Sequence, residues 1–237
     1  MKNGPLRLLG LLLLGTLRPG LIGSAQVPAR PGWVDTFAVD KKDFVSVGTN
    51  AFFRLEPGYR LKLEGREGSG QVTLIITVLE ETRAVDGVET RIVEERESND
   101  GRLVEVSRNF FAFNTADGGV YYFGEEVDIY KDGRIVGHEG AWESGREGAR
   151  FGLMMPGQPA AGARFYQEVA PGLAMDRAEI VGLDAKLKTP AGEFSGCLKV
   201  AETTPLEHGK EYKLYAPGVG LIQDSSLLLT EYGQARK

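Results

Sequence analysis

The residues best placed for chemistry are Glu125 and His138, which flank the dipeptide Asp132-Gly133. Asp-Gly is typical of the type I′ turn that closes a two-residue β-hairpin. In that register His138 faces Val127 and Glu125 faces Gly140, so the carboxylate and the imidazole lie diagonally on one face of the sheet. Such groups are costly to bury on an apolar face unless they are paired or hydrated. We therefore expect a polar pair that orients a ligand's polar group or acts as a general acid and base.

Apolar side chains surround this pair in the predicted register, and a later segment rich in glycine and proline adds two more. The predicted ligand-binding set consists of Tyr121, Phe123, Glu125, Val127, His138, Trp142, Met154 and Phe165. The pair has two other interpretations, a satisfied pair in the core or a barrel mouth where both groups reach water. All three depend on the register, because a slip of one residue moves every side chain to the other face.

The opposite face of the same hairpin is acidic. It carries Glu126, Asp128, Glu139 and Glu143, with Glu126 directly across from Glu139. Like charges in this position are destabilising unless they are solvated or bridged by a cation. Oxygen ligands suit calcium, but the spacing of an EF-hand loop is absent. A solvated acidic face is therefore the preferred interpretation, with a metal site as the weaker alternative.

Other catalytic signatures are missing from the sequence. There is no nucleophile elbow, P-loop, H-E-x-x-H motif or dinucleotide-binding glycine fingerprint, so no cofactor is predicted. One cysteine and two histidines exclude a cysteine-based zinc cluster and a three-histidine site. Cys197 is predicted to be a small strand residue, with an intermolecular disulfide as the alternative.

The elements that must position these residues are strands. Asp-Gly occurs at 86–87, 100–101, 117–118 and 132–133, each time between β-forming residues, and no long segment has helical periodicity. Strands joined by two-residue loops are antiparallel, so these turns predict a meander. Further strand-like segments follow between 178 and 232, with a turn at Thr189-Pro190-Ala191-Gly192. The predicted fold is all-β, an antiparallel meander curled into a barrel or half-barrel.

Residues 145–176 are rich in glycine and proline but also carry large apolar side chains. A segment of this length without regular structure is uncommon and is often a lid or a binding loop. We expect it to lie over the sheet as a long loop. No polar linker separates the two strand-rich parts, so residues 26–237 are predicted to form one domain, with a break near 145–176 as the alternative.

The first 25 residues have the pattern of a secretory signal peptide. Lys2 and Arg7 precede an apolar stretch from Leu8 to Leu17, and Gly23-Ser24-Ala25 supplies small residues before a predicted cleavage at Gln26. The stretch is shorter than the roughly 20 residues that a transmembrane helix needs. We therefore predict an exported protein, periplasmic or secreted, with no stable membrane span after cleavage.

Charge narrows the choice of partner. Cleavage removes three of the 28 basic residues and no acidic one, which leaves 25 against 33 acids and a net charge near −8. A negative surface opposes binding to phosphate backbones, so nucleic acid is not an expected partner.

Several short motifs resemble a family of exported bacterial β-rich proteins of uncharacterised function. The similar segments are Asn50–Gly58, Leu63–Gly65, Tyr122–Glu125, His138–Glu143, Met155-Pro156, Thr204–Glu207 and Tyr215–Leu221. The likeness spans roughly residues 50–222. Ala51 stands where members usually have proline. The resemblance implies export and a β-rich fold, and it implies no activity.

Three functions fit these observations. The first is binding of a small, largely apolar ligand in an internal cavity of a β-barrel. The second is a hydrolase, lyase or isomerase that uses Glu125 and His138 as its acid–base pair. The third is a structural or partner-binding module of the cell envelope, with charged stretches such as Glu94-Glu95-Arg96-Glu97 on solvated strand edges.

Overall fold

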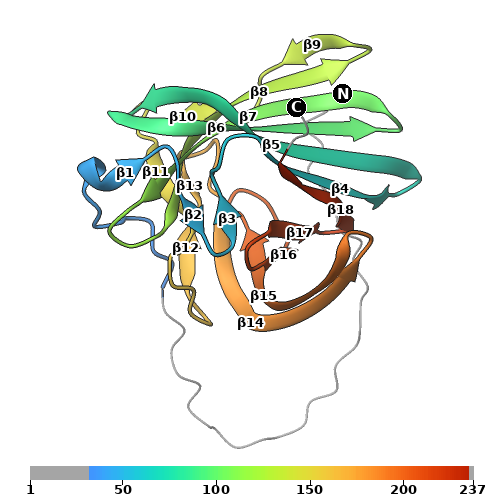
Figure 1. The fold of residues 1–237 in the computed structure, drawn as a ribbon. Helices are drawn as coiled ribbons and strands as arrows, with labels where there is room; N and C mark the ends of the chain where they lie inside the picture. The colour runs from blue at the N-terminus through green and yellow to red at the C-terminus, as the bar shows by residue number, and fades with distance from the viewer. Residues whose placement is uncertain (1–31, 235–237) are drawn as a thin grey trace, which may run out of the picture.

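The computed structural model describes residues 32–234, and most of them lie in strands (Figure 1). The predicted signal segment 1–25 and its cleavage point lie outside the described residues. The one helix in the described part is the short 3₁₀ turn η1 (Lys41–Asp43), which Asp40 caps by accepting from the Lys42 N–H. The strands are β1 (Phe44–Val45), β2 (Thr49–Asn50), β3 (Phe53–Arg54), β4 (Tyr59–Glu67), β5 (Gly70–Val85), β6 (Val88–Asn99), β7 (Arg102–Asn114), β8 (Val120–Lys131), β9 (Arg134–Gly137), β10 (Trp142–Glu143), β11 (Arg150–Met155), β12 (Arg164–Tyr166), β13 (Glu168–Val169), β14 (Arg177–Thr189), β15 (Gly192–Thr203), β16 (Glu211–Ala216), β17 (Gly220–Asp224) and β18 (Leu227–Gln234).

The Asp-Gly dipeptides build the meander from β5 to β9. At Asp86-Gly87, Asp100-Gly101 and Asp132-Gly133 both residues have positive φ, as a type I′ turn requires. The flanking strands pair up to the residues next to each dipeptide. Asp117-Gly118 is different, because only Gly118 has positive φ and the Asn114 side chain accepts hydrogen bonds from the backbone of a longer loop.

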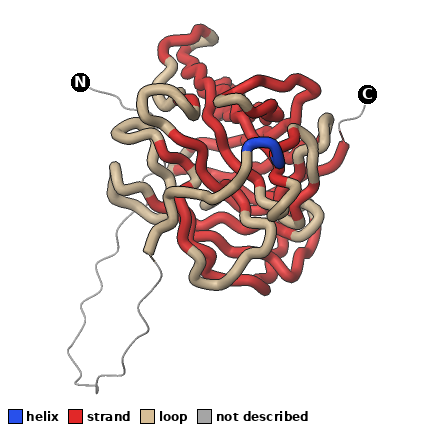
Figure 2. The backbone as a smooth tube through the Cα atoms, turned by 90° about the vertical axis from the view of Figure 1, so that its left-hand side faces the viewer, coloured by secondary structure: helices blue, strands red, loops and turns tan. Residues whose placement is uncertain are grey.

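The sheet curls until its two ends meet. Its strands pair in the order β12-β14-β15-β16-β17-β18-β4-β5-β6-β7-β8-β11-β13, and every pair along this path is antiparallel. The strands at the two ends, β12 and β13, are separated in sequence only by Gln167. The stretch 164–169 therefore joins β14 to β11 and nearly closes the sheet into a barrel (Figures 1 and 2). This architecture confirms the predicted fold class.

One part of the prediction differs from the structure. Residues 145–176 were expected to form a long loop over the sheet, but they carry β11, β12 and β13 and complete the barrel wall. Glycine at position 152 makes this possible, since a Cβ there would lie 2.2 Å from the carbonyl oxygen of Gln167. The glycines of this segment thus permit close backbone packing as well as turns.

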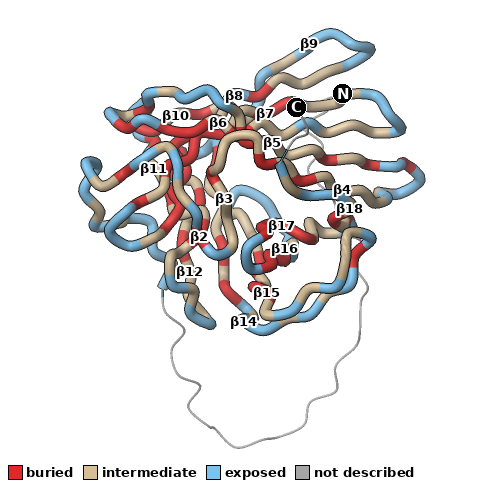
Figure 3. The backbone as a smooth tube through the Cα atoms, in the orientation of Figure 1, coloured by how far each residue is buried: buried red, intermediate tan, exposed pale blue. Residues whose placement is uncertain are grey.

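Two apolar clusters hold the fold together. The larger one lies inside the barrel and includes alternate residues of β4, Tyr59, Leu61 and Leu63, whose neighbours Arg60 and Lys62 are more exposed. The smaller one packs Phe44 of β1 against aromatic side chains on the outer face of β7 and β8. The β8–β9 hairpin projects from the barrel and is largely exposed at its tip (Figure 3).

Candidate functional site

The hairpin at Asp132-Gly133 forms, but its register differs from the predicted one. Ile129 pairs with Gly137, where the prediction had Val136, because a β-bulge follows Ile129. The chain then leaves the sheet after Gly137 and returns with Trp142 opposite Glu125. The opposition of Glu125 to Gly140 is therefore wrong, and the shift changes which side chains share a face.

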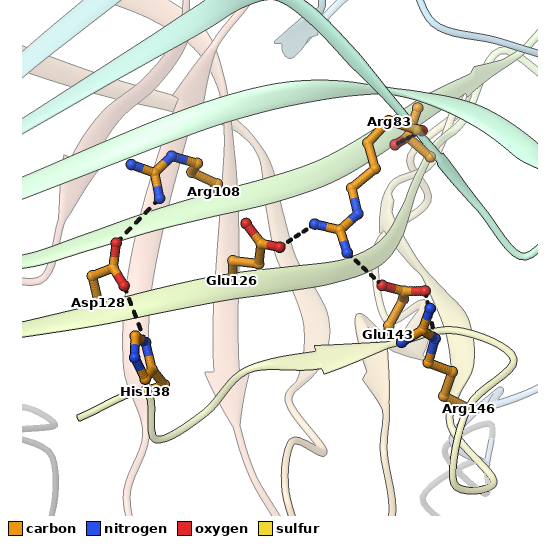
Figure 4. Close-up of polar contacts among 8 residues, drawn as sticks. Arg83, Arg108, Glu126, Asp128, His138, Glu143 and Arg146 are labelled. Carbon is orange, nitrogen blue, oxygen red and sulfur yellow. Dashed lines mark hydrogen bonds and ion pairs between the residues drawn. The ribbon is translucent and has the colours of Figure 1, made fainter.

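His138 lies on the outside of the barrel. Its side chain is 66% exposed, and Nδ1 lies 3.0 Å from a carboxylate oxygen of Asp128 and 2.8 Å from the Val127 carbonyl oxygen (Figure 4). Glu125 lies on the inner face, where it pairs with Asn109 of β7. The predicted proximity of Glu125 and His138 is thus wrong, and with it the predicted acid–base pair.

The acidic face predicted on this hairpin is neutralised by arginines. Arg83 forms ion pairs with Glu126 and, at 2.8 Å, with Glu143 (Figure 4). Glu143 also forms an ion pair with Arg146 at 2.8 Å. Arg108 lies 3.2 Å from Asp128.

Glu126 lies opposite Arg108 of β7, not opposite Glu139, which lies beyond the end of β9. The described residues contain no group of three or more histidine, cysteine or acidic side chains that could hold a metal ion. The four predicted acids therefore do not form a cation site, and the metal alternative is wrong.

The predicted apolar lining is divided between the two sides of the barrel wall. A bulge at Phe123-Gly124 of β8, where Gly124 has a φ of 140°, reverses the alternation of side chains along this strand. Tyr121 and Phe123 consequently face outward and pack on Phe44, while Glu125 faces inward.

The remaining predicted residues lie inward or in the main core. Val127 is buried and pairs with Ser107. Trp142 and Phe165 belong to the main core, and Trp142 packs edge-on against Tyr122. Met154 is the one member of the predicted set that lines the internal cavity.

That cavity lies inside the barrel, between the meander and the C-terminal strands. Its solvent-accessible volume is about 70 Å³, and it opens to solvent on one side. Its walls are apolar and aromatic, and they consist chiefly of Phe52, Tyr59, Leu61, Ile76, Val78 and Val93. The charged part of its lining, called the floor here, consists of Glu95 from β6, Lys213 from β16 and Asp224 from β17.

The floor is organised around Lys213. Register places Lys213 opposite Asp224 on β17, with the nitrogen 3.7 Å from the Asp224 carboxylate. Glu202 of β15 approaches the same nitrogen to 2.9 Å. Burial acts to lower the pKa of Lys213, but the charges of Asp224 and Glu202 outweigh it and hold the pKa well above the usual value. Lys213 is therefore a permanent cation shared by two carboxylates.

Glu95 reaches the floor from a distant part of the sheet. In the pairing order, β6 is separated from β17 by three strands, so the barrel curvature brings Glu95 and Asp224 to one cavity. Burial raises the pKa of Glu95 to about 7, although Lys213 acts to lower it. Glu97, two residues along the same inner face, also has a pKa raised to about 7 by burial and by Glu105. Such perturbed carboxyl groups are a feature of functional sites.

The mouth and the seam of the barrel each contribute a fixed polar group. At the mouth, Arg54 pairs with Glu56, lies 4.5 Å from the centre of the Tyr59 ring and donates to the Gly218 carbonyl. At the seam, which is the stretch 164–169 that joins β14 to β11, the buried Gln167 donates to Glu202 at 2.9 Å. Closure of the barrel is thereby linked directly to the charged floor.

Sequence reasoning missed the floor. Glu95 and Glu97 belong to a charged run that was assigned to a solvated edge, and the structure places both on the inner face. Lys213 alternates with Tyr212 and Leu214 in Glu211–Ala216, a pattern that by itself predicts a solvent-facing lysine, so no local signal marked it. Cys197 is a free thiol buried in β15, which confirms the prediction of a small strand residue.

Comparison with known proteins adds little to this geometry. No protein-family model and no curated protein matches the chain. Among solved structures, a proposed lipoprotein from Parabacteroides distasonis aligns with 78% of this chain and 100% of its own length, at 14% identity and a TM-score of 0.39. A TM-score this low does not establish a shared fold. A search of the described residues finds no helix with the length and apolar character needed to cross a membrane.

Proposed function

We propose that the protein binds a small, largely apolar ligand inside the barrel, with the polar end of the ligand at the charged floor. The observation that carries this proposal is the division of one cavity into an apolar wall, which includes Tyr59 and Val93, and a floor formed by Glu95, Lys213 and Asp224. Ligand sites commonly combine a mainly apolar lining with a few convergent polar groups.

The walls and the floor of this cavity both suit a binding role. Apolar surface removed from water contributes about 25 cal/mol per Å², so the aromatic and aliphatic walls supply affinity for an apolar body. The floor supplies orientation, because Lys213 is held in place by two carboxylates and Glu202 is held by Gln167. A polar group that enters the cavity therefore meets positioned partners.

We further propose that the protein acts after export, in the periplasm or outside the cell. The support is the predicted signal peptide at residues 1–25, which combines a basic start, an apolar stretch and small residues before the cleavage point.

An enzyme based on Glu125 and His138 is not supported. The two side chains lie on opposite sides of the barrel wall, and His138 is hydrogen-bonded on the outside.

The experiment uses N-phenyl-1-naphthylamine, a neutral aromatic dye that fluoresces in apolar surroundings. We expect saturable binding with one dye per chain. Ile76→Trp fills the cavity and should weaken binding at least about tenfold, equivalent to about 1.4 kcal/mol. Ile135→Trp adds the same ring at the exposed hairpin tip and serves as the matched control.

Circular dichroism and thermal melting establish that the variants are folded. If Ile76→Trp unfolds, Met154→Trp fills the same cavity from another strand. Absence of saturable dye binding, or equal binding by the filled variants and the wild type, contradicts the proposal.

A further inference from the structure

We propose that the polar end of the ligand is positively charged, so that the cavity selects an amine attached to an apolar or aromatic body. This inference rests on the proposed binding function and specifies its ligand class. It depends on how the charged side chains that line the cavity are already paired. Four such residues line it, Arg54, Glu95, Lys213 and Asp224.

Both cations of the lining are already paired with carboxylates. Arg54 at the mouth is paired with Glu56 and also donates to a backbone carbonyl. Lys213 in the floor is shared between Glu202 and Asp224. An anionic head group that approaches either cation therefore also meets the carboxylates already paired with it, and their repulsion opposes its binding.

Glu95 is in the opposite situation. Among the residues that the structure describes, no lysine or arginine forms an ion pair with its carboxylate, and Lys213 acts on it only at longer range. The other charged groups that act on it, Asp224, Glu105 and Glu202, are all acidic and approach from β17, β7 and β15. A cation that enters beside Glu95 gains a partner and relieves this repulsion.

The walls suit the remainder of such a ligand. Phe52, Phe53 and Tyr59 present aromatic rings to the same space, and an ammonium group over a ring face is attracted by the ring quadrupole. A phenyl ring on a short alkyl chain is a body that these apolar walls can contact. The raised pKa of Glu95 supports the assignment, because a carboxyl group that is hard to ionise gains the most from a bound cation.

The test compares three probes with the same body and different head groups, 4-phenylbutylamine, 4-phenylbutan-1-ol and 4-phenylbutanoate. Isothermal titration calorimetry at pH 8 measures each Kd with the full chain. We expect the amine to bind at least about tenfold more tightly than the alcohol, and the carboxylate to bind most weakly.

Glu95→Gln should bring the affinity for the amine to within about twofold of that for the alcohol. Glu94→Gln provides the matched control, because Glu94 is the neighbouring residue but points outward to Arg108 and Arg96. It should leave the preference for the amine unchanged.

The outcomes separate the two proposals. If the alcohol binds and the amine binds no more tightly, the positive head group is wrong and the apolar binding site stands. The same conclusion follows if Glu95→Gln keeps the full preference for the amine. If none of the three probes binds and the neutral dye also fails to bind, the proposed binding function itself is wrong.

Discussion

Inside the barrel, the ammonium nitrogen of Lys213 lies 2.9 Å from a carboxylate oxygen of Glu202 on the neighbouring strand. Both side chains are mostly buried, and Glu202 also accepts a hydrogen bond from Gln167 at the point where the sheet closes. One ion pair thus belongs both to the floor of the cavity and to the seam of the barrel. The stability of the fold and the chemistry of the site should therefore respond together when it is changed.

Removal of the lysine tests this link. Lys213→Met leaves Glu202 and Asp224 without their cation, and we expect the free energy of unfolding at pH 7.5 to fall by about 2–4 kcal/mol. The loss should be smaller at pH 5, where the carboxylates can take up protons. Urea unfolding provides the measurement. Lys188→Met removes a surface pair with Glu193 and should cost less than about 1 kcal/mol. Equal losses in the two variants contradict a shared buried cation.

Glu95 makes stability depend on pH in a defined direction. Its pKa is about 7 in the folded chain, above the ordinary value of 4.5, so the folded state holds a proton that the unfolded state has released. Stability should therefore fall as pH rises from about 4.5 to about 7 and change little above that range through this group. Glu95→Gln removes the free-energy cost of ionising this carboxyl group in the folded state.

We expect Glu95→Gln to stabilise the protein by about 1–3 kcal/mol at pH 8 and by much less at pH 4. Denaturant unfolding across this pH range checks the prediction, with Glu94→Gln on the outer face as the control. A Glu95→Gln variant that is less stable than the wild type at pH 8 contradicts the assignment of a raised pKa.

His138 should not contribute to ligand binding. Its imidazole contacts Asp128 and the Val127 carbonyl on the outside of the barrel. His138→Gln should leave the Kd of the naphthylamine dye within about twofold of the wild-type value. Dye titration of the variant checks this prediction. A tenfold loss of affinity would show that the imidazole contributes to ligand binding.

Closure of the barrel depends on Gly152. A Cβ at this position would lie 2.2 Å from the Gln167 carbonyl oxygen, so Gly152→Ala must push β11 away from the seam. We expect a loss of at least about 2 kcal/mol in the free energy of unfolding. Gly209→Ala is the matched control, because a Cβ there meets nothing within 4 Å and no positive φ is required. Thermal melting that shows the same small change for both variants contradicts the closed seam.

The sequence carries local information about this fold reliably. Asp-Gly at 86–87, 100–101 and 132–133 specifies type I′ turns because both residues of such a turn need positive φ, and the structure confirms all three. These turns fix the antiparallel pairing of β5, β6 and β7 and of β8 with β9. The all-β class and the barrel follow from the same pattern, together with the scarcity of helical periodicity.

The candidate site could not be predicted in the same way, because it depends on small irregularities and on distant strands. Bulges at Gly124 and after Ile129 shift the register, and each one reverses the inner and outer faces beyond it. Because the predicted register lacked both bulges, it placed Tyr121 and His138 on the inner face, whereas both lie on the outside of the barrel. Lys213 and Glu95 line one cavity only because the sheet curls, and no local pattern reports that curvature.

The most direct test of the cavity follows the methyl signal of Met154. With methionine methyl groups labelled by carbon-13, Met154→Leu identifies this signal, since Met154 lines the cavity while Met155 is buried in the core. Saturation with N-phenyl-1-naphthylamine should shift the Met154 signal strongly through the ring current of the dye and leave the Met175 signal in place. A dye that binds the chain without moving the Met154 signal would show that the ligand site lies elsewhere.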